Sequence, residues 1–302
     1  MINYSIIIPH KNIPQLLQRC LDSIPRREDV QIIVVDDNSG ADKVDFAIFP
    51  GINDPYVEVI FGKNENGRKG AGYARNLGLE RAKGKWLIFA DADDFFMPCF
   101  NEILDKYINN ENDIIYFNIT SVFSDTLLPA NRHEHIIRIF NEVQKTGNFD
   151  VLFDIETVYG KIIKRNLVEI NNIQFKEYIW SNDVYFAVKC GVFADKKIVT
   201  YDVVYCLTVR EGSLEYQHTS ESLKVRFFAS NEAALLLKKH IRKEGGKFRF
   251  SGGKIRLLWW WDEIFDRNKK EAFFLLPYMI STCGVRFVYK KIIIPKIKRK
   301  IK

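Results

Sequence analysis

The chain has 302 residues, of which 47% are hydrophobic, enough to bury the core of one large or two small domains. Its formal net charge is +7, but eight basic residues and no acidic ones fall between Arg286 and Lys302, and removing them leaves 37 of the 45 basic side chains against 38 acidic ones. The rest of the chain is therefore nearly neutral, which argues against nucleic-acid binding by its globular part.

The first hundred residues alternate strand patterns with helix patterns. Short apolar, β-branched runs predict buried strands, and apolar residues at helical spacing predict helices. The predicted strands are residues 5–9, 30–40, 56–67 and 85–94, and the predicted helices are residues 14–24 and 70–84. This alternation is the α/β pattern of a parallel sheet.

Three of these strands end in polar residues, at His10 to Asn12, Asp36 to Ser39 and Asp91 to Asp94. Ligands in parallel α/β sheets bind beyond the carboxyl ends of the strands. We therefore predict one ligand site formed by all three strand ends.

The pattern weakens after residue 110. The elements expected there are a strand at 113–120, a strand or turn followed by a helix at 159–175, a helix from Ser181 or Asn182 to about 194, a strand at 197–213, and helices from 221 onward. The segment before residue 150 has no clear period. The expected domains are 1–110, 111–220 and 221–302.

The segment "WLIFADADDFFMP" (86–98) places Asp91, Asp93 and Asp94 at the end of a buried strand. Ionised carboxylates cost several kcal/mol to desolvate unless a positive group meets them. We expect this partner to arrive with a ligand, as a divalent cation or a substrate group. The alternative for a D-x-D segment alone is a solvated turn that caps the next helix.

Four segments in this order, "SIIIPHKN", "IIVVDDNSG", "RKGAGYARNLGLERAKGKWLIFADADD" and "WSNDVYFAV", resemble the family-2 inverting glycosyltransferases with a GT-A fold, over residues 1 to about 215. The resemblance implies a Rossmann-like, mostly parallel sheet flanked by helices, with a helical C-terminal extension. It also implies the transfer of a hexosyl group, with inversion, from a nucleotide-diphosphate sugar (best guess a UDP-sugar) to a glycan or lipid-linked acceptor. The setting would be the synthesis of a bacterial cell-surface polysaccharide.

The resemblance assigns donor-binding roles to matching residues. Asp36 or Asp37 would accept a hydrogen bond from the base. The D-x-D of Asp91, Ala92 and Asp93 would face the sugar through Asp91 and hold Mn or Mg through Asp93.

Further residues belong to the same implied donor site. Arg75, with Lys69 and Gly70 before it, would lie near the diphosphate. Pro9 ends the first strand, and Lys11 stands where relatives often have an aromatic residue. Base stacking must then come from another residue or be absent.

The resemblance also assigns the acceptor side. Asp183 would be the catalytic base that takes the proton of the acceptor hydroxyl, with Asn182 in place of the usual glutamate and Trp180 partly desolvating it. Asp94 would cap the next helix.

Other assignments are weaker. Lys161 would contact the diphosphate or lie solvated on the surface, and Arg210 and Ser213 would belong to a loop that closes over the site. His218 is a candidate metal ligand, although a lone histidine in a polar loop usually binds no metal.

Two other functions remain open on the sequence alone. A D-x-D phosphohydrolase would use Asp91 as nucleophile and Asp93 as acid, and a relative that binds glycans without catalysis would keep the fold. A phospho-accepting receiver domain is disfavoured, because a strand and a helix precede "IIVVDDNS".

Five cysteines, none in C-x-x-C spacing, argue against a disulfide framework and a structural zinc. The start of the chain shows no signal-peptide pattern, so a cytoplasmic location is expected.

Residues 272–285 are apolar but shorter than the roughly 20 residues that span a bilayer. With the basic residues 286–302 they predict a peripheral membrane tail on the inner face of the cell membrane. The alternative is a helix packed on the core with a solvated basic end.

Overall fold

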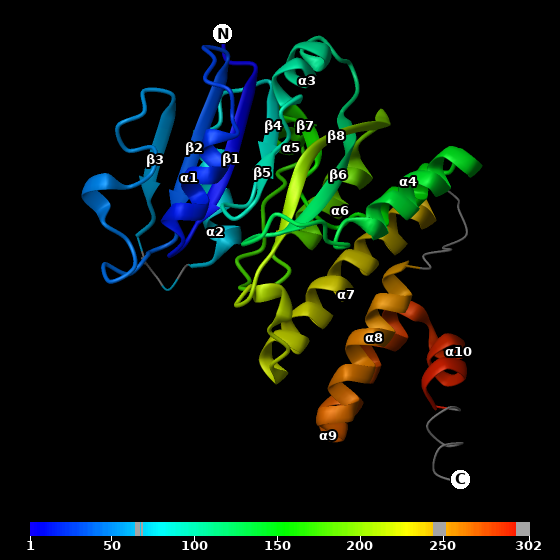
Figure 1. Ribbon diagram of the computed structural model, residues 1–302. Coiled ribbons are helices and arrows are strands. Elements are labelled where there is room, and N and C mark those ends of the chain that lie inside the picture. The colour runs from blue at the N-terminus through cyan, green and yellow to red at the C-terminus, as the bar shows by residue number, and fades with distance from the viewer. Residues whose placement is uncertain (64–66, 68, 244–251, 294–302) are drawn as a thin grey trace. The chain divides into compact units, whose positions relative to one another are not determined.

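The computed structural model describes residues 1–63, 67, 69–243 and 252–293. It divides into two units, Met1–Ser213 and Leu214–Lys302. The first unit contains one sheet, drawn in Figure 1, with the strand order β3-β2-β1-β4-β7-β6-β8-β5. Its strands are β1 (Tyr4–His10), β2 (Val30–Asp36), β3 (Val57–Phe61), β4 (Trp86–Phe89), β5 (Phe95–Phe96), β6 (Ile114–Phe123), β7 (Lys161–Lys164) and β8 (Lys197–Val209).

The sheet is parallel in the half formed by the first hundred residues. β1 pairs in parallel with β2 and β4, and β2 pairs in parallel with β3. β6 and β8 are also parallel, whereas β7 joins β4 to β6 in antiparallel pairing and β5 is antiparallel to β8. The chain places β2 and β3 on one side of β1 and then crosses to β4 on its other side. The carboxyl ends of β1 and β4 therefore form the topological switch point at which such sheets bind ligands.

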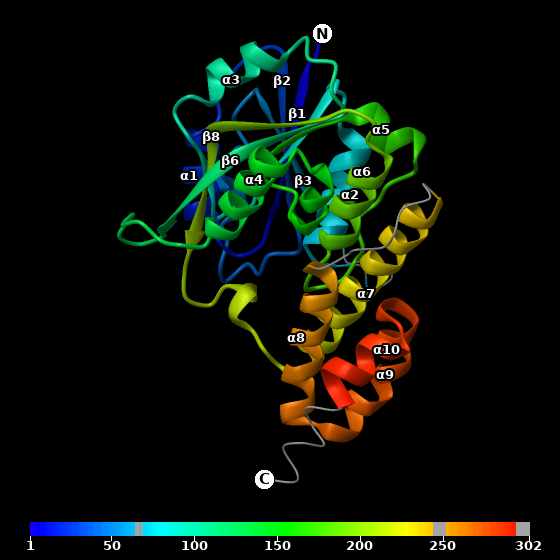
Figure 2. The same cartoon turned by 90° about the vertical axis from the view of Figure 1, so that its right-hand side faces the viewer.

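Helices cover both faces of this sheet, with α1 on one face and α2, α5 and α6 on the other (Figure 2). This cover explains why every residue of β1 and β4 is buried. The helices of the first unit are α1 (Pro14–Asp22), α2 (Ala71–Arg81), α3 (Phe100–Tyr107), α4 (Glu134–Thr146), α5 (Arg165–Ile170) and α6 (Val184–Phe193).

The predicted α/β architecture with a parallel sheet and C-terminal helices is confirmed, with corrections to individual elements. The strands predicted at 30–40 and 56–67 end earlier, at Asp36 and Phe61, before the polar residues of each segment. A helix after Asp94 was expected without bounds and is present as α3, whereas α4 was missed. In α4 the apolar side chains Ile136, Phe140 and Val143 do recur at helical spacing and are buried.

The second unit is helical, as predicted. It contains α7 (Ser220–Lys243), α8 (Gly252–Arg267), α9 (Lys269–Cys283), α10 (Val285–Val288) and the π-helical turn η5 (Tyr289–Ile293). Its interior includes Leu237, Trp261 and Met279, and the Trp261 indole N–H donates to the carbonyl of Ala272 at 2.7 Å. None of the helices among the described residues has both the length and the hydropathy that a membrane span requires. Part of the predicted basic tail, residues 294–302, lies outside the described residues.

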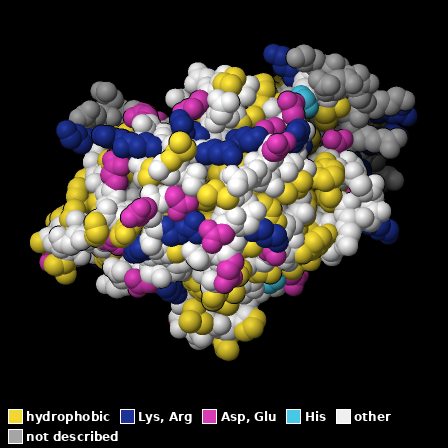
Figure 3. All heavy atoms as spheres, turned by 90° about the horizontal axis from the view of Figure 1, so that it is seen from above, with side chains coloured by type: hydrophobic (Ala, Val, Ile, Leu, Met, Phe, Trp, Pro, Cys, Tyr) yellow, Lys and Arg dark blue, Asp and Glu magenta, His cyan; other side chains and the backbone are white. Residues whose placement is uncertain are grey.

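The surface carries mixed charge. Figure 3 shows Lys and Arg side chains interspersed with Asp and Glu over the face that it presents. This pattern fits the near-neutral charge of the chain without its C-terminal residues.

Candidate functional site

The ends of β1 and β2 are joined by a buried hydrogen-bond network around Asp36. The Nδ1 of His10 donates to the Asp36 carboxylate at 2.8 Å, and both the backbone N–H and the hydroxyl of Ser39 donate to it. His10 Nε2 accepts from the backbone N–H of Ile13, which assigns the proton to Nδ1. Burial raises the pKa of Asp36, but the hydrogen bonds from His10 and Ser39 outweigh it and hold this pKa below its ordinary value. The Asp36 carboxylate therefore stabilises the loops that follow β1 and β2.

Asp37, the next residue, is placed differently. Its Oδ2 accepts from Lys11 at 3.2 Å, whereas its buried Oδ1 has no hydrogen-bond partner among the described residues. The buried amide nitrogen of Asn38 likewise has no partner there. Asn38 and Asn12 both have positive φ angles, +56° and +60°, which turn the two loops sharply at the strand ends. Of the two aspartates that the sequence left open, the geometry favours Asp37 as a ligand-binding residue.

The aspartates that follow β4 are paired within the protein. Arg75 of α2 is 5% exposed, and one of its terminal nitrogens donates to Asp91 at 2.5 Å. Its other terminal nitrogen donates to the side-chain oxygen of Asn182 at 2.6 Å. Arg75 thus joins the end of β4 to the segment before α6. Asn182, which replaces the usual glutamate, has a defined role as an acceptor for this arginine.

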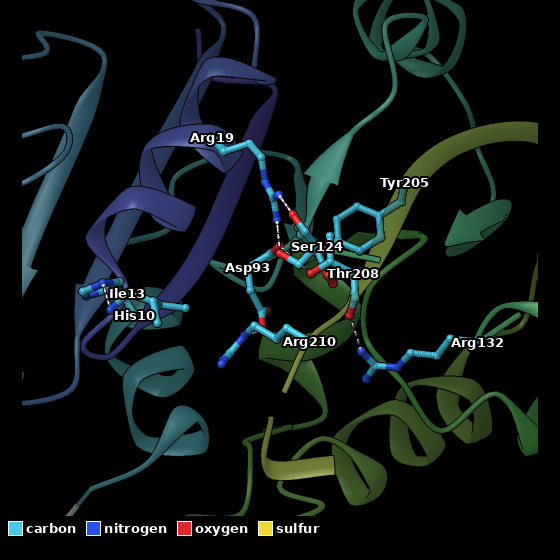
Figure 4. Close-up of polar contacts among 10 residues, drawn as sticks. His10, Ile13, Arg19, Asp93, Ser124, Arg132, Tyr205, Thr208 and Arg210 are labelled. Carbon is cyan, nitrogen blue, oxygen red and sulfur yellow. Dashed lines mark hydrogen bonds and ion pairs between the residues drawn. The ribbon is translucent and has the colours of Figure 1, made fainter. Parts of the chain in front are cut away.

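Asp93 is also paired. Arg210, directly after β8, donates from Nε to Asp93 Oδ2 at 2.7 Å, and Arg19 of α1 donates to the backbone carbonyl of Asp93 at 2.6 Å (Figure 4). The expectation that Asp91 and Asp93 lack a positive partner in the protein was therefore wrong. Arg75 and Arg210 are distant from the two aspartates along the chain, so local sequence could not reveal the pairs.

Asp94 has a structural role different from the predicted helix cap. α3 begins at Phe100 with Cys99 at its N-cap, so Asp94 caps no helix. Its buried carboxylate accepts from the Tyr205 hydroxyl at 3.0 Å and from the Thr208 backbone N–H at 2.7 Å. Burial, with the neighbouring charges of Asp93 and Asp91, raises the pKa of Asp94 well above its usual range.

Tyr205 connects Asp94 to the rest of the turn. Its hydroxyl oxygen accepts from the backbone N–H of Asp91 at 2.8 Å while its O–H donates to Asp94. The Thr208 hydroxyl donates to the carbonyl of Asp93 at 2.7 Å. Two side chains of β8, Tyr205 and Thr208, therefore hold the turn of residues 91–94 in place, and the sequence analysis did not identify either of them.

Asp183 lies at the N-cap of α6, which begins at Val184, two or three residues after the predicted start at Ser181 or Asn182. The Asp183 side chain makes no capping hydrogen bond. Ser181 has a φ angle of +52°, a strained conformation that turns the chain just before Asn182 and Asp183. Because Arg75 binds both Asn182 and Asp91, Asp183 directly follows a residue that is joined through this arginine to the turn of residues 91–94.

The segment "GYARNLG" at the start of α2 packs directly on the loop before α6. A Cβ added to Gly72 would lie 2.0 Å from the carbonyl oxygen of Lys176, so only glycine permits this approach. Asn76 exchanges two hydrogen bonds with the backbone of Phe175, at 2.8 and 3.0 Å. These contacts fix Arg75 between Asp91 and Asn182.

Other predicted site residues on this side are placed as follows. Lys69 is exposed and precedes Gly70, which has a φ of +95° at the N-cap of α2. Arg68 lies outside the described residues. Trp180 is nine-tenths buried, and its indole N–H has no hydrogen-bond partner among the described residues. Pro9 lies within β1 and Ala92 is buried in the turn. Ser213 is the last residue of the first unit.

Lys161 is neither a surface lysine nor placed to meet a diphosphate. It is 4% exposed, and its ammonium donates to the carbonyls of Ile155 and Thr157 at 2.8 and 2.6 Å. Burial lowers the pKa of Lys161 from 10.5 to about 8. Its role is to hold the loop before β7, which was not foreseen because the pattern "YGKIIK" does not reveal burial.

His218 belongs to the second unit, where its ring lies 6.0 Å from that of Trp259 and 6.3 Å from that of Trp260. These contacts with α8 give no support to its assignment as a metal ligand. No group of three or more His, Cys, Asp or Glu side chains within the described residues forms a metal site. Asp91 and Asp93 nevertheless offer the hard carboxylate oxygens that Mg and Mn bind, with water and phosphate able to supply further ligands.

The family model of "Glycosyl transferase family 2" matches residues 5–169. The putative glycosyltransferase EpsH of Bacillus subtilis is 25% identical over 198 residues, which cover 63% of this chain and 56% of EpsH. The chain thus spans about half the length of EpsH, and it spans only 34% of the glycosyltransferase GlyA of Streptococcus pneumoniae.

Two solved structures show the same fold. S. aureus TarS 1-349 in complex with UDP-GlcNAc aligns with a TM-score of 0.61 at 19% identity, covering 95% of this chain and 81% of that one. The mannosyltransferase PcManGT from Pyrobaculum calidifontis, in complex with GDP-Man and Mn²⁺, aligns with a TM-score of 0.54 at 16% identity, covering 96% of this chain and 86% of that one. The predicted GT-A-like fold is confirmed by these likenesses.

The burial of Lys161 predicts a pH-dependent stability difference. Between pH 8 and 10.5 the unfolded chain binds more protons at Lys161 than the folded chain, so this group's destabilising effect is full below pH 8 and is relieved as the pH rises. Relative to Lys161→Met, the wild-type free energy of unfolding should rise over this range by about 3 kcal/mol. Urea denaturation at several pH values measures the difference, with Lys145→Met, an exposed lysine, as control. A constant difference between wild type and Lys161→Met would contradict the burial.

The hydrogen bond between Tyr205 and Asp94 predicts a coupling. Tyr205→Phe leaves the Asp91 N–H and the Asp94 carboxylate without this hydroxyl, so it should cost about 1–3 kcal/mol of stability. In an Asp94→Asn background the cost should be smaller by at least about 0.5 kcal/mol. Urea denaturation of the two single variants and the double variant measures this coupling. Tyr4→Phe, which loses a buried hydrogen bond to the carbonyl of Leu104, is the control, and its stability cost should be the same with and without Asp94→Asn. If the stability cost of Tyr205→Phe were also the same in both backgrounds, the described network would be refuted.

Proposed function

Because the chain belongs to glycosyl transferase family 2, we propose that it transfers a sugar from a nucleotide-diphosphate sugar, by preference a UDP-sugar, to a hydroxyl group of a glycan or lipid-linked acceptor with inversion. The observation that carries this proposal is the Arg75 bridge, which gathers Asp91 and the Asn182–Asp183 segment at the carboxyl edge of the parallel sheet. Family membership removes the phosphohydrolase and receiver alternatives. Cell-surface polysaccharide synthesis is the setting that we propose for the reaction.

The base of the donor is proposed to bind at Asp37 and Asn38. Asp37 presents a buried acceptor oxygen and Asn38 a buried donor nitrogen, both without protein partners among the described residues. Uracil and guanine each carry a ring N–H beside a carbonyl oxygen, which is the complementary pattern. Cytosine carries an amino donor beside a ring acceptor, so it also offers one donor and one acceptor, in the reversed order, and these two buried groups alone do not exclude it.

The diphosphate is proposed to lie over the turn of residues 91–94 and the start of α2. The backbone N–H groups that follow Gly70 and the charges of Lys69 and Arg75 suit phosphate oxygens. Asp93, with Asp91 beside it, is the proposed ligand of a divalent cation, which when bound supplies positive charge to the departing diphosphate. The likeness to a Mn²⁺-containing mannosyltransferase structure supports a divalent cation in the fold.

Asp183 is the proposed catalytic base. The acceptor hydroxyl would attack the anomeric carbon from the face opposite the diphosphate and give its proton to the Asp183 carboxylate as the bond to the phosphate oxygen breaks. This single displacement inverts the anomeric centre. The buried indole N–H of Trp180, three residues earlier, is available to hydrogen-bond an acceptor oxygen.

Donor binding is predicted to require a divalent cation. UDP should bind in the presence of Mn. Adding EDTA should weaken binding at least about tenfold, because the Asp93 carboxylate and the diphosphate then meet without the cation, and Asp93→Asn should weaken it to a similar extent, because it removes a ligand of that cation. Isothermal titration calorimetry measures the affinity. Asp42→Asn, which changes an exposed aspartate whose side chain is 73% accessible, is the control. Equal affinity for UDP with and without EDTA would contradict the proposed metal site.

The base assignment predicts a selective loss of rate. Asp183→Asn keeps the size of the side chain but cannot take the proton, so kcat should fall at least about a hundredfold while UDP affinity is unchanged. Release of UDP from UDP-sugars in the presence of acceptor measures the rate. Asp195→Asn, just beyond the other end of α6, is the matched control. Transfer by Asp183→Asn at near the wild-type rate would show that another group is the base, and donor binding without transfer by the wild type would indicate a non-catalytic relative.

A further inference from the structure

α9 has apolar residues on both its inner and its outer face. The inner face is buried in the second unit through Ala272, Leu275 and Met279. The outer face exposes Phe273 and Phe274, whose exposed fractions are 57% and 79%. An amphipathic helix of a globular protein normally presents charged residues on its outer face, so α9 departs from this rule.

The exposed apolar surface continues beyond these two phenylalanines. Its members belong to α9 and to α10 and η5, which follow Gly284, and each is exposed: Phe273, Phe274, Pro277, Tyr278, Ile280, Val285 and Tyr289. Between Glu271 and Arg286 the sequence has no charged residue at all. Single exposed apolar residues are common, but a contiguous aromatic surface of this kind marks an interaction site. We call these seven residues the outer face of α9.

Positive charges flank the outer face of α9 at both ends. Lys269 and Lys270 are exposed at the start of the helix, and Arg286, Lys290 and Lys291 are exposed after its end. Glu271 is the single acidic residue between positions 268 and 293 of the sequence, and it forms an ion pair with Lys224 of α7. Apart from this paired glutamate, the charged residues that flank the outer face of α9 along the sequence are therefore basic.

We propose that the outer face of α9, with its flanking lysines and arginines, docks on an anionic lipid surface. Aromatic side chains favour the boundary between headgroups and acyl chains, and basic residues beside them meet anionic headgroups. A second copy of the same face would bring like charges together, which disfavours self-association.

This proposal narrows the membrane contact expected from the sequence. The sequence assigned it to the apolar residues 272–285 together with the basic residues 286–302, whereas we now place the apolar anchor on one exposed face of α9, with the neighbouring cations as auxiliary contacts. α9 would lie in the plane of the interface. The proposal does not depend on the glycosyltransferase reaction, although a lipid-linked acceptor would be present at such a surface.

Flotation of the full chain with lipid vesicles tests the proposal. The protein should float with vesicles of phosphatidylglycerol and phosphatidylcholine at low salt, and less well with phosphatidylcholine alone or at high salt. Phe273→Ser with Phe274→Ser keeps every charge but removes two aromatic anchors, so vesicle affinity should fall at least about tenfold. Leu128→Ser with Ile170→Ser removes two apolar residues of the first unit, 62% and 73% exposed, and should leave affinity unchanged. Circular dichroism confirms that each variant is folded.

Three outcomes would overturn the proposal. In the first, the wild type stays soluble beside anionic vesicles at low salt. In the second, deletion of residues 294–302 abolishes flotation while Phe273→Ser with Phe274→Ser has no effect, so that the tail alone binds lipid. In the third, sedimentation shows a dimer that the phenylalanine variant loses and flotation is absent, so that the face joins two copies of the chain. UDP binding measured beside these assays distinguishes failure of this proposal from failure of the proposed reaction.

Discussion

The first unit has to accommodate three carboxylates within four residues at the end of a buried strand. Asp91, Asp93 and Asp94 would repel one another and lose hydration there. Each is stabilised from a different element: Asp91 by Arg75 of α2, Asp93 by Arg210 after β8, and Asp94 by Tyr205 and Thr208 of β8. The positions of these elements around the sheet end follow from this requirement as much as from apolar packing.

The pairing of the acidic turn has a consequence for ligand binding. Asp91 and Asp93 each have an arginine partner, and the side chains of Asp93 and Arg210 are partly exposed, at 20% and 28%. A cation that binds Asp93 must share or replace the Arg210 contact, whereas Arg75 is buried and held by Asn182 as well. In the proposed site, Arg75 would thus keep its contacts when a ligand binds, whereas a cation could take the place of Arg210 at Asp93. Asp94 stays within the protein interior and contributes rigidity to the turn.

The sequence predicted the elements whose signals are local. β1, β2, α1, α2 and β4 follow from short apolar runs and helical spacing, and the polar strand ends marked the edge that carries the site. Contacts between distant residues were not predictable in this way. The partners of Asp93 and Asp94 lie on β8 or directly after it. The burial of Lys161 depends on the loop of residues 155–160. The preference for Asp37 over Asp36 as a ligand-binding residue depends on the hydrogen bonds that His10 and Ser39 donate to Asp36. The outer face of α9 was also hidden, because an apolar run does not show which residues the fold leaves exposed.

The central claim is that the ends of β1, β2 and β4 and the start of α2 form one nucleotide-sugar site. Hydrogen–deuterium exchange of the full chain, with and without UDP and Mn, tests it most directly. The account predicts slower amide exchange in three separate loops, residues 10–13, 36–40 and 90–94, and at the start of α2, since one ligand contacts them all. Slower exchange in only one of these loops, or protection confined to another part of the chain, would contradict it.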